Sequence, residues 1–147
     1  MGKEWTKGAV ACIGPFLLGF VAALAFAGCG GESKSSAGGT LPDCVRAGED
    51  VVDLFELPRP EGTIFDRRGR EFGRNVVQGY VPGDLQGVRD FFQRELPRHG
   101  YELGEGDAEE HEAETDFEGN GVKGHLKLHD IADCDGAVSI SIAYGND

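Results

Sequence analysis

The stretch EAETDFEGNGVKGHLKLH, residues 112–129, decides the fold because one strand register satisfies both of its faces. At its centre lies Asn120-Gly121, the dipeptide preferred in two-residue hairpin turns. Counting outward from this turn places every acid opposite a base: Glu118 faces Lys123, Asp116 faces His125, Glu114 faces Lys127 and Glu112 faces His129. On the other face, the same count opposes Ala113 with Leu128, Thr115 with Leu126 and Phe117 with Gly124. We therefore predict an antiparallel hairpin with one buried face and one charged, solvated face.

The hairpin also accounts for an acidic run, because nine carboxylates lie between Glu102 and Glu118 with no Lys or Arg among them. A calcium site is the alternative, but the run lacks the D-x-[DN]-x-[DN]-G spacing that wraps oxygens around a cation. His125 and His129 do not form a chelating pair, since four residues along a strand separate them by about 13 Å. We predict no metal site and no cofactor.

One helix is predicted before this hairpin, in PGDLQGVRDFFQRELPRHG, residues 82–100. Asp84 can cap its N-terminus and Gly100 can end it. One side of the helix carries the apolar residues Leu85, Val88, Phe91, Phe92 and Leu96. This stripe indicates a helix packed on a sheet rather than a helix that binds a partner or a membrane surface.

Further strands are predicted at residues 63–67 and 74–81, around a turn at Gly69, and in the last stretch AVSISIAYG, residues 137–145. Ser139 and Ser141 fall on the exposed side of that last strand. Before the first strand, four apolar residues are expected to contact the core, namely Val51, Val52, Leu54 and Phe55.

A basic cluster stands out in the first of these hairpins, formed by Arg67, Arg68, Arg70 and Arg74. We interpret it as a solvated hairpin, with an anionic polymer or a partner's carboxylates as the alternative contact. Together these elements predict a two-layer α+β domain, with one amphipathic helix packed on a mainly antiparallel sheet of four to six strands.

The only continuously apolar stretch is GAVACIGPFLLGFVAALAFA, residues 8–27, which follows Lys3 and Lys7. It is long enough to span a bilayer, which takes about 20 residues, whereas the core of a signal peptide is usually shorter. Yet it runs into the small residues Ala27 and Gly28 and then Cys29, without the Lys or Arg that usually ends a membrane-spanning helix. The stretch is therefore an export signal or a membrane anchor.

The residues AFAGCGG resemble the lipobox of bacterial lipoprotein precursors, with Ala27, Gly28 and Cys29 matching the pattern and Phe26 standing where Leu is usual. The resemblance implies a signal peptide at residues 1–28, a lipidated Cys29 with a flexible tether at residues 29–40, and one domain at residues 41–147. An uncleaved transmembrane helix is the alternative anchor. Both place the domain on the extracytoplasmic side of the cell membrane, because the positive residues stay inside.

This processing decides the roles of the cysteines. Cys12 leaves with the signal peptide, Cys29 takes the lipid, and Cys44 and Cys134 remain near the two ends of the domain. We expect these two to form a disulfide, which an oxidising compartment permits; two buried free thiols are the alternative. The order of helix and following strands also loosely resembles small secreted domains of unassigned role in bacterial lipoproteins.

The sequence bounds the function without naming a ligand. A formal charge of -12 argues against nucleic-acid binding, which needs clustered Lys and Arg. No catalytic pattern is present, and no catalytic residue is assigned, although Asp116 with His125, or His99, could act as acid or base in a cleft. We predict a lipid-anchored extracytoplasmic module that binds an envelope protein or polymer, with a cell-surface hydrolase as the alternative.

Overall fold

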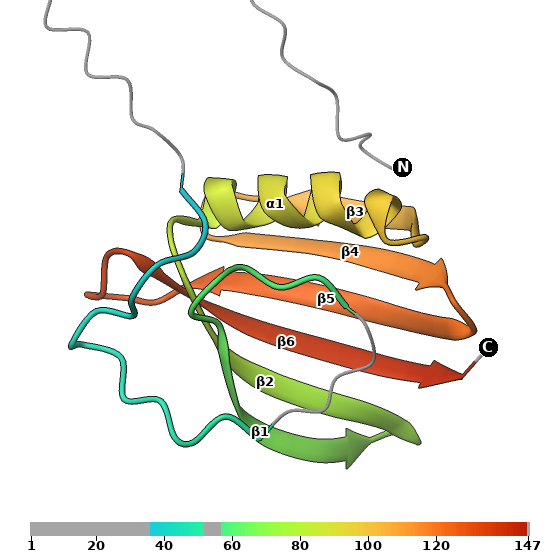
Figure 1. The fold of residues 1–147 in the computed structure, drawn as a ribbon, viewed down its shortest axis with the longest axis horizontal. Coiled ribbons are helices and arrows are strands. Elements are labelled where there is room, and N and C mark those ends of the chain that lie inside the picture. Colours follow the sequence, from blue (N-terminus) through green and yellow to red (C-terminus); the bar gives the residue numbers. More distant parts are fainter. Residues whose placement is uncertain (1–35, 52–56, 147) are drawn as a thin grey trace, which may run out of the picture.

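Six strands and one helix make up the part of the chain that the computed structural model describes, residues 36–51 and 57–146 (Figure 1). In chain order they are β1 Ile64–Glu71, β2 Arg74–Pro82, α1 Leu85–Arg98, β3 Glu102–Ala108, β4 Glu112–Gly119, β5 Val122–Asp130 and β6 Ala137–Asn146. All strands lie in one antiparallel sheet, in the order β1-β2-β6-β5-β4-β3. The predicted α+β class, a helix on a mainly antiparallel sheet, is confirmed. The predictions for the signal peptide, Cys29, Val52, Leu54 and Phe55 lie outside the described residues.

The β4–β5 hairpin has the register that its sequence predicts. Gly119 pairs with Val122, and every further pair follows as counted, out to Glu112 opposite His129. Asn120 and Gly121 form the turn with φ angles of 53° and 74°, the left-handed values that this dipeptide accommodates. Ala113 and Phe117 are buried, and the charged face is open to solvent.

The β1–β2 hairpin corrects the predicted turn at Gly69. Gly69 instead lies within β1 opposite Val76, and the turn is formed by Phe72 and Gly73. Gly73 has φ 83°, a conformation that favours glycine. Pairing continues to the last residues, Glu71 opposite Arg74, and every residue from 67 to 75 is exposed.

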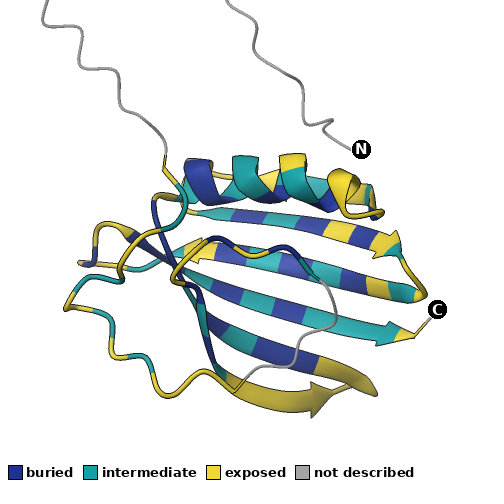
Figure 2. Ribbon diagram, in the orientation of Figure 1, coloured by how far each residue is buried: buried dark blue, intermediate teal, exposed yellow. Residues whose placement is uncertain are grey.

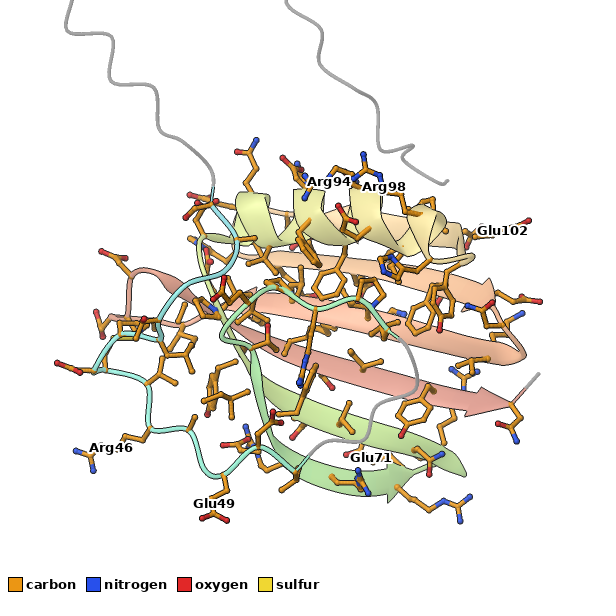
Figure 3. The ribbon with its side chains drawn as sticks, in the orientation of Figure 1. Arg46, Glu49, Glu71, Arg94, Arg98 and Glu102 are labelled. Carbon is orange, nitrogen blue, oxygen red and sulfur yellow. A yellow bond between two sulfur atoms is a disulfide. The ribbon has the colours of Figure 1, made fainter. Side chains whose placement is uncertain are left out.

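The helix has the predicted boundaries. The Asp84 side chain caps it by accepting a hydrogen bond from the Gly87 N–H at 2.8 Å, and Gly100 follows its end with φ 83°. Val88, Phe92 and Leu96 are buried, while Arg94 and Arg98 point away from the sheet (Figure 3). Among the described residues, no helix has the length and hydropathy needed to cross a membrane.

Two segments of the chain cover the same face of the sheet. The helix α1 contacts β3, β4, β5 and β6. The segment before β1 adds Ala37 and Leu57 to the core. The expectation that Val51 contacts the core is wrong. Val51 is 42% exposed, and its backbone N–H donates a hydrogen bond to the Phe65 carbonyl at 2.8 Å.

Residues 36–40, expected as part of the flexible tether, are hydrogen-bonded to the domain. The Gly38 N–H donates to the Pro82 carbonyl at 2.7 Å, and the Ser36 N–H donates to the Asp84 carboxylate at 2.6 Å. Gly87 permits this contact, because a Cβ there would overlap the backbone of Ser36. Farther on, Cys44 forms a disulfide with Cys134 and ties the N-terminal segment to the β5–β6 loop.

Candidate functional site

The face of the sheet opposite α1 is polar, and its charges are sorted by strand. Glu112, Glu114, Asp116 and Glu118 of β4 lie beside Lys123, His125, Lys127 and His129 of β5. The Lys123 ammonium is 2.9 Å from the Glu118 carboxylate, and His125 Nδ1 is 2.9 Å from Asp116. This ladder of cross-strand pairs accounts for four of the nine carboxylates in the acidic run.

The strongest contact in the ladder is diagonal rather than directly across. Lys127 Nζ lies 2.8 Å from Glu112 but 3.8 Å from Glu114, its opposite residue in the register. The hydrogen bond from Lys127 lowers the pKa of Glu112, and the same bond raises the pKa of Lys127. Lys127 is therefore held in place by two carboxylates beside the centre of the sheet.

A shallow trough runs along the same face above β6. The outward side chains of this strand are small, namely Ser139, Ser141, Ala143 and Gly145. Longer side chains flank them on β5 and β2, and side chains stand roughly perpendicular to a sheet, so the middle is hollow. The pocket at Ser139 and Ser141 has a volume of about 240 Å³. We name it the β6 trough; its polar lining side chains are Arg67, Gln78, Lys127, His129, Ser139 and Ser141.

Strand register, rather than loop conformation, positions these groups. Arg67 lies opposite Gln78, Gln78 opposite Ser141, and Ser141 opposite Lys127, which makes one row across β1, β2, β6 and β5. Arg67 projects from an edge strand with a side chain 60% exposed. The row offers a guanidinium, an amide, a hydroxyl and an ammonium, a set of hydrogen-bond donors suited to an anionic or hydroxylated ligand.

None of the histidines in the described residues is buried, so none forms part of a buried catalytic arrangement. His129 lines the trough with Nε2 at 3.5 Å from Glu112, while the Ser139 hydroxyl donates to the His129 carbonyl at 3.1 Å rather than to its ring. His125 is oriented by Asp116 on the open face of the sheet. His99 follows the helix, with Nδ1 2.9 Å from the Glu95 carbonyl.

A second, larger cleft of about 630 Å³ lies between the start of α1 and the β5–β6 loop. Its charged lining residues are Asp84, His111, Asp130, Asp133 and Asp135. Asp84 is used as the helix cap, and His111 Nδ1 is 3.5 Å from Asp130. Within residues 36–51 and 57–146, no group of three or more His, Cys, Asp or Glu side chains could hold a metal ion.

The sequence predicted some of this site and missed its shape. It placed His129, Ser139 and Ser141 on the solvent face and identified Arg67 as part of a basic cluster, but it did not bring them together. Gln78 and His111 were not singled out. The one available signal was the run of small residues at alternate positions of β6, and it becomes informative only once β6 is known to lie between β2 and β5.

Comparison with known proteins adds no relative. No family model matches the chain, and neither a curated protein nor a solved structure matches it.

Proposed function

We propose that this protein is a lipid-anchored binding module on the extracytoplasmic side of a membrane, and that the β6 trough is its binding surface. The observation that carries the proposal is the row from Arg67 to Lys127, which sets hydrogen-bond donors across the open β6 trough, from the edge strand β1 to β5. An open channel suits an extended polymer better than a small molecule, which is usually enclosed by its site.

The chemistry of the trough indicates the class of ligand. Guanidinium and ammonium groups favour carboxylates, while Ser139, Ser141 and Gln78 suit hydroxyl groups. We therefore propose an acidic polysaccharide of the cell envelope. The helix has a separate role: we infer that α1 is amphipathic and serves as a scaffold, because its buried side chains Val88, Phe92 and Leu96 pack on the opposite face of the sheet.

The binding proposal is tested by filling the trough. Ser141→Tyr places a bulky ring on the floor, while Glu105→Tyr adds the same ring on the exposed edge strand β3 as a control. The full chain, in detergent, is titrated with alginate as a polyuronate and with dextran as a neutral polymer. We expect alginate to bind in a salt-sensitive manner and Ser141→Tyr alone to abolish binding. Equal binding of alginate by both variants would contradict the proposed site.

The proposed lipid anchor is tested by the mass of the protein isolated from host membranes. Processing at Cys29 removes Met1 and Trp5, the only methionine and the only tryptophan of the chain. We expect a mature form that begins at Cys29, lacks both residues and carries acyl chains. A membrane-bound form that keeps Met1 and Trp5 and carries no acyl chain would favour an uncleaved helix.

A cell-surface hydrolase is the second candidate, favoured only by the position of His129 and Glu112 beside Ser139. An activated serine reacts with a fluorophosphonate, which forms an adduct on its oxygen. The contact from Ser139 to a backbone carbonyl predicts no adduct. An adduct on Ser139 that disappears in His129→Gln would establish the hydrolase instead.

A further inference from the structure

The end of the β1–β2 hairpin lies outside the core and carries a fully exposed aromatic ring. Every residue from 67 to 75 is exposed, as the yellow end of β1 and β2 shows (Figure 2). Phe72, at the turn, is 106% exposed, whereas the only other large apolar residue exposed in the described chain is Val51 at 42%. Phe72 therefore contributes nothing to the core.

The backbone makes the presence of this phenylalanine more informative. Phe72 and Gly73 both have positive φ angles, 49° and 83°, as do Asn120 and Gly121 at the turn of the β4–β5 hairpin. Asn is preferred at the first of these positions, whereas a bulky residue with positive φ is uncommon and costs free energy. One hairpin uses the preferred residue and the other uses Phe without any packing gain. Folding alone does not explain Phe72.

The charges around the ring are positive in a chain that is strongly acidic overall. Four arginines lie within residues 66–74, against the carboxylates of Asp66 and Glu71, whereas the whole chain has a formal charge of -12. Arg67 pairs with Asp66 at 3.3 Å. Arg68 and Arg70 donate to the neutral carbonyls of Val51 and Gly73. These two bonds do not neutralise the guanidinium charges, and all four arginines are exposed.

We propose that this hairpin end, residues 67–74, is a membrane-contact finger. The ring of Phe72 enters the interface of an anionic bilayer, and the surrounding guanidinium groups bind lipid phosphates. Arginine forms strong, charge-assisted hydrogen bonds with phosphate oxygens, and aromatic rings partition into the interface. Each arginine near an anionic surface strengthens binding about fivefold.

A bilayer fits the finger better than a protein partner does. A specific protein interface usually buries about 800 Å² on each partner, so a protein would have to cover surface well beyond the turn itself. A protein would also need a socket shaped for one ring, whereas a fluid bilayer admits it without one. Because one ring and a few arginines bind weakly, the finger acts together with the proposed anchor at Cys29, and in this respect it rests on the proposed function.

The finger would then fix the orientation of the domain. Residue 36 enters beside the start of α1, and the β1–β2 turn lies at the opposite corner of the molecule (Figure 1). Six residues lie between Cys29 and Ser36, so the seven steps from one Cα to the other span at most about 25 Å. Contact at both corners restricts the orientation of the domain, whereas a tether alone lets it tumble.

The experiment measures whether position 72 reaches lipid. Full chains with Trp5→Phe and Phe72→Trp are reconstituted in phosphatidylcholine vesicles, with or without phosphatidylglycerol, whose acyl chains carry bromine close to the headgroup. Asn120→Trp is the matched control, because it occupies the equivalent turn position of the β4–β5 hairpin. A third variant adds Arg68→Gln, Arg70→Gln and Arg74→Gln to Phe72→Trp. Formation of the Cys44–Cys134 disulfide checks that each variant folds.

We expect bromine to quench the indole of the Phe72→Trp variant in anionic vesicles, the quenching to weaken in neutral vesicles or high salt, and the arginine variant to lose it. The indole of the Asn120→Trp control, on a turn at the same end of the sheet, is quenched less than that of the Phe72→Trp variant in anionic vesicles. Equal quenching of the two indoles overturns the proposal, as does quenching at position 72 that does not depend on anionic lipid. If the finger binds a protein instead, the indole is not quenched in these vesicles, which contain no other protein, and the proposal is overturned. Alginate binding by the β6 trough is measured separately, so either proposal can fail alone.

Discussion

At the scale of single residues, the turns of the β1–β2 and β4–β5 hairpins show that one backbone conformation can carry unlike side chains. Asn120 stabilises its turn twice, because it tolerates a φ of 53° and its Nδ2 donates to the His99 carbonyl at 2.9 Å. Phe72, with φ 49°, has neither advantage. Asn120 therefore stabilises the fold at its turn, whereas Phe72 does not.

Exchanging these side chains should change stability in opposite directions. Phe72→Asn should raise the free energy of unfolding by about 0.5–1 kcal/mol, because Asn adopts positive φ at lower cost. Asn120→Phe should lower it, since the variant gains that cost and loses the bond to His99. Urea denaturation measures both. A less stable Phe72→Asn protein would show that Phe72 does contribute to folding.

Another single position controls how the core face packs. Gly124 lies opposite Phe117, and a Cβ on Gly124 would overlap the aromatic ring. Phe117 uses that space to pack edge-on against Tyr101, with ring centroids 5.6 Å apart. Although glycine is a weak strand former, Gly124 of β5 is therefore part of the core.

At the scale of elements, α1 and the β4–β5 hairpin are stabilised differently. The helix buries apolar side chains, and burial of a large side chain contributes about 1.5–3 kcal/mol. The outer face of the hairpin is held by partly exposed ion pairs, each contributing well under about 1 kcal/mol. Truncation should therefore cost far more in the helix than charge removal costs in the hairpin.

Leu96→Ala tests the contribution of the helix. Leu96 has no exposed surface, so its truncation should lower the free energy of unfolding by about 2–5 kcal/mol, through lost burial and the cavity left behind. Gln86→Ala, on the exposed side of the same helix, should change it by less than about 0.5 kcal/mol. Chemical denaturation of the two variants compares them directly, and similar losses would argue against α1 as a packing helix.

Glu112→Gln tests the ladder through its pH dependence. The folded-state pKa of Glu112 lies below 4.5, so its contribution is complete above pH 4.5 and is lost as pH falls through the lowered pKa. The pKa of Lys127 lies above 10.5, so its contribution is complete below pH 10.5 and is lost as pH rises through the raised pKa. Glu112→Gln should reduce both losses.

Urea midpoints across the acidic and alkaline ranges measure this effect. Glu105→Gln, an exposed position on β3, is the control and should leave the alkaline loss unchanged. If Glu112→Gln and Glu105→Gln give the same pH profiles, the contact between Lys127 and Glu112 does not contribute to stability.

At the scale of the whole molecule, the first and the last described segments both complete the fold. The C-terminal strand β6 enters between β2 and β5 and joins the two hairpins. The N-terminal segment covers the core face beside α1, and the disulfide links it to the β5–β6 loop. These contacts join residues that are far apart in the sequence.

Reduction of the disulfide should therefore be costly. Its closure spans a sequence separation of 90 residues, and the chain-entropy model gives a loss of about 4–5 kcal/mol in the free energy of unfolding. The double variant Cys44→Ser with Cys134→Ser should match the reduced protein. Thermal denaturation with and without reductant measures the difference. A double variant as stable as the oxidised protein would exclude this contribution.

The sequence by itself determined the local elements whose chemistry is complete within a short stretch. The helix boundaries follow from Asp84 and Gly100, and the β4–β5 register follows from Asn120-Gly121 and two faces that agree. The turn at Gly69 was wrong because the sequence contains two glycines near that turn, and only the pairing of β1 with β2 selects Gly73.

Only the tertiary structure decided what lies side by side. Strand order is set by long-range packing, which no short stretch encodes, so the position of β6 and the trough above it could not be counted out from any turn. The exposure of Phe72 could not be predicted from the sequence either, because an apolar residue in a strand pattern is exposed only where the rest of the fold leaves it uncovered. Local hydrogen bonding and side-chain alternation specify elements, whereas burial depends on all of them together.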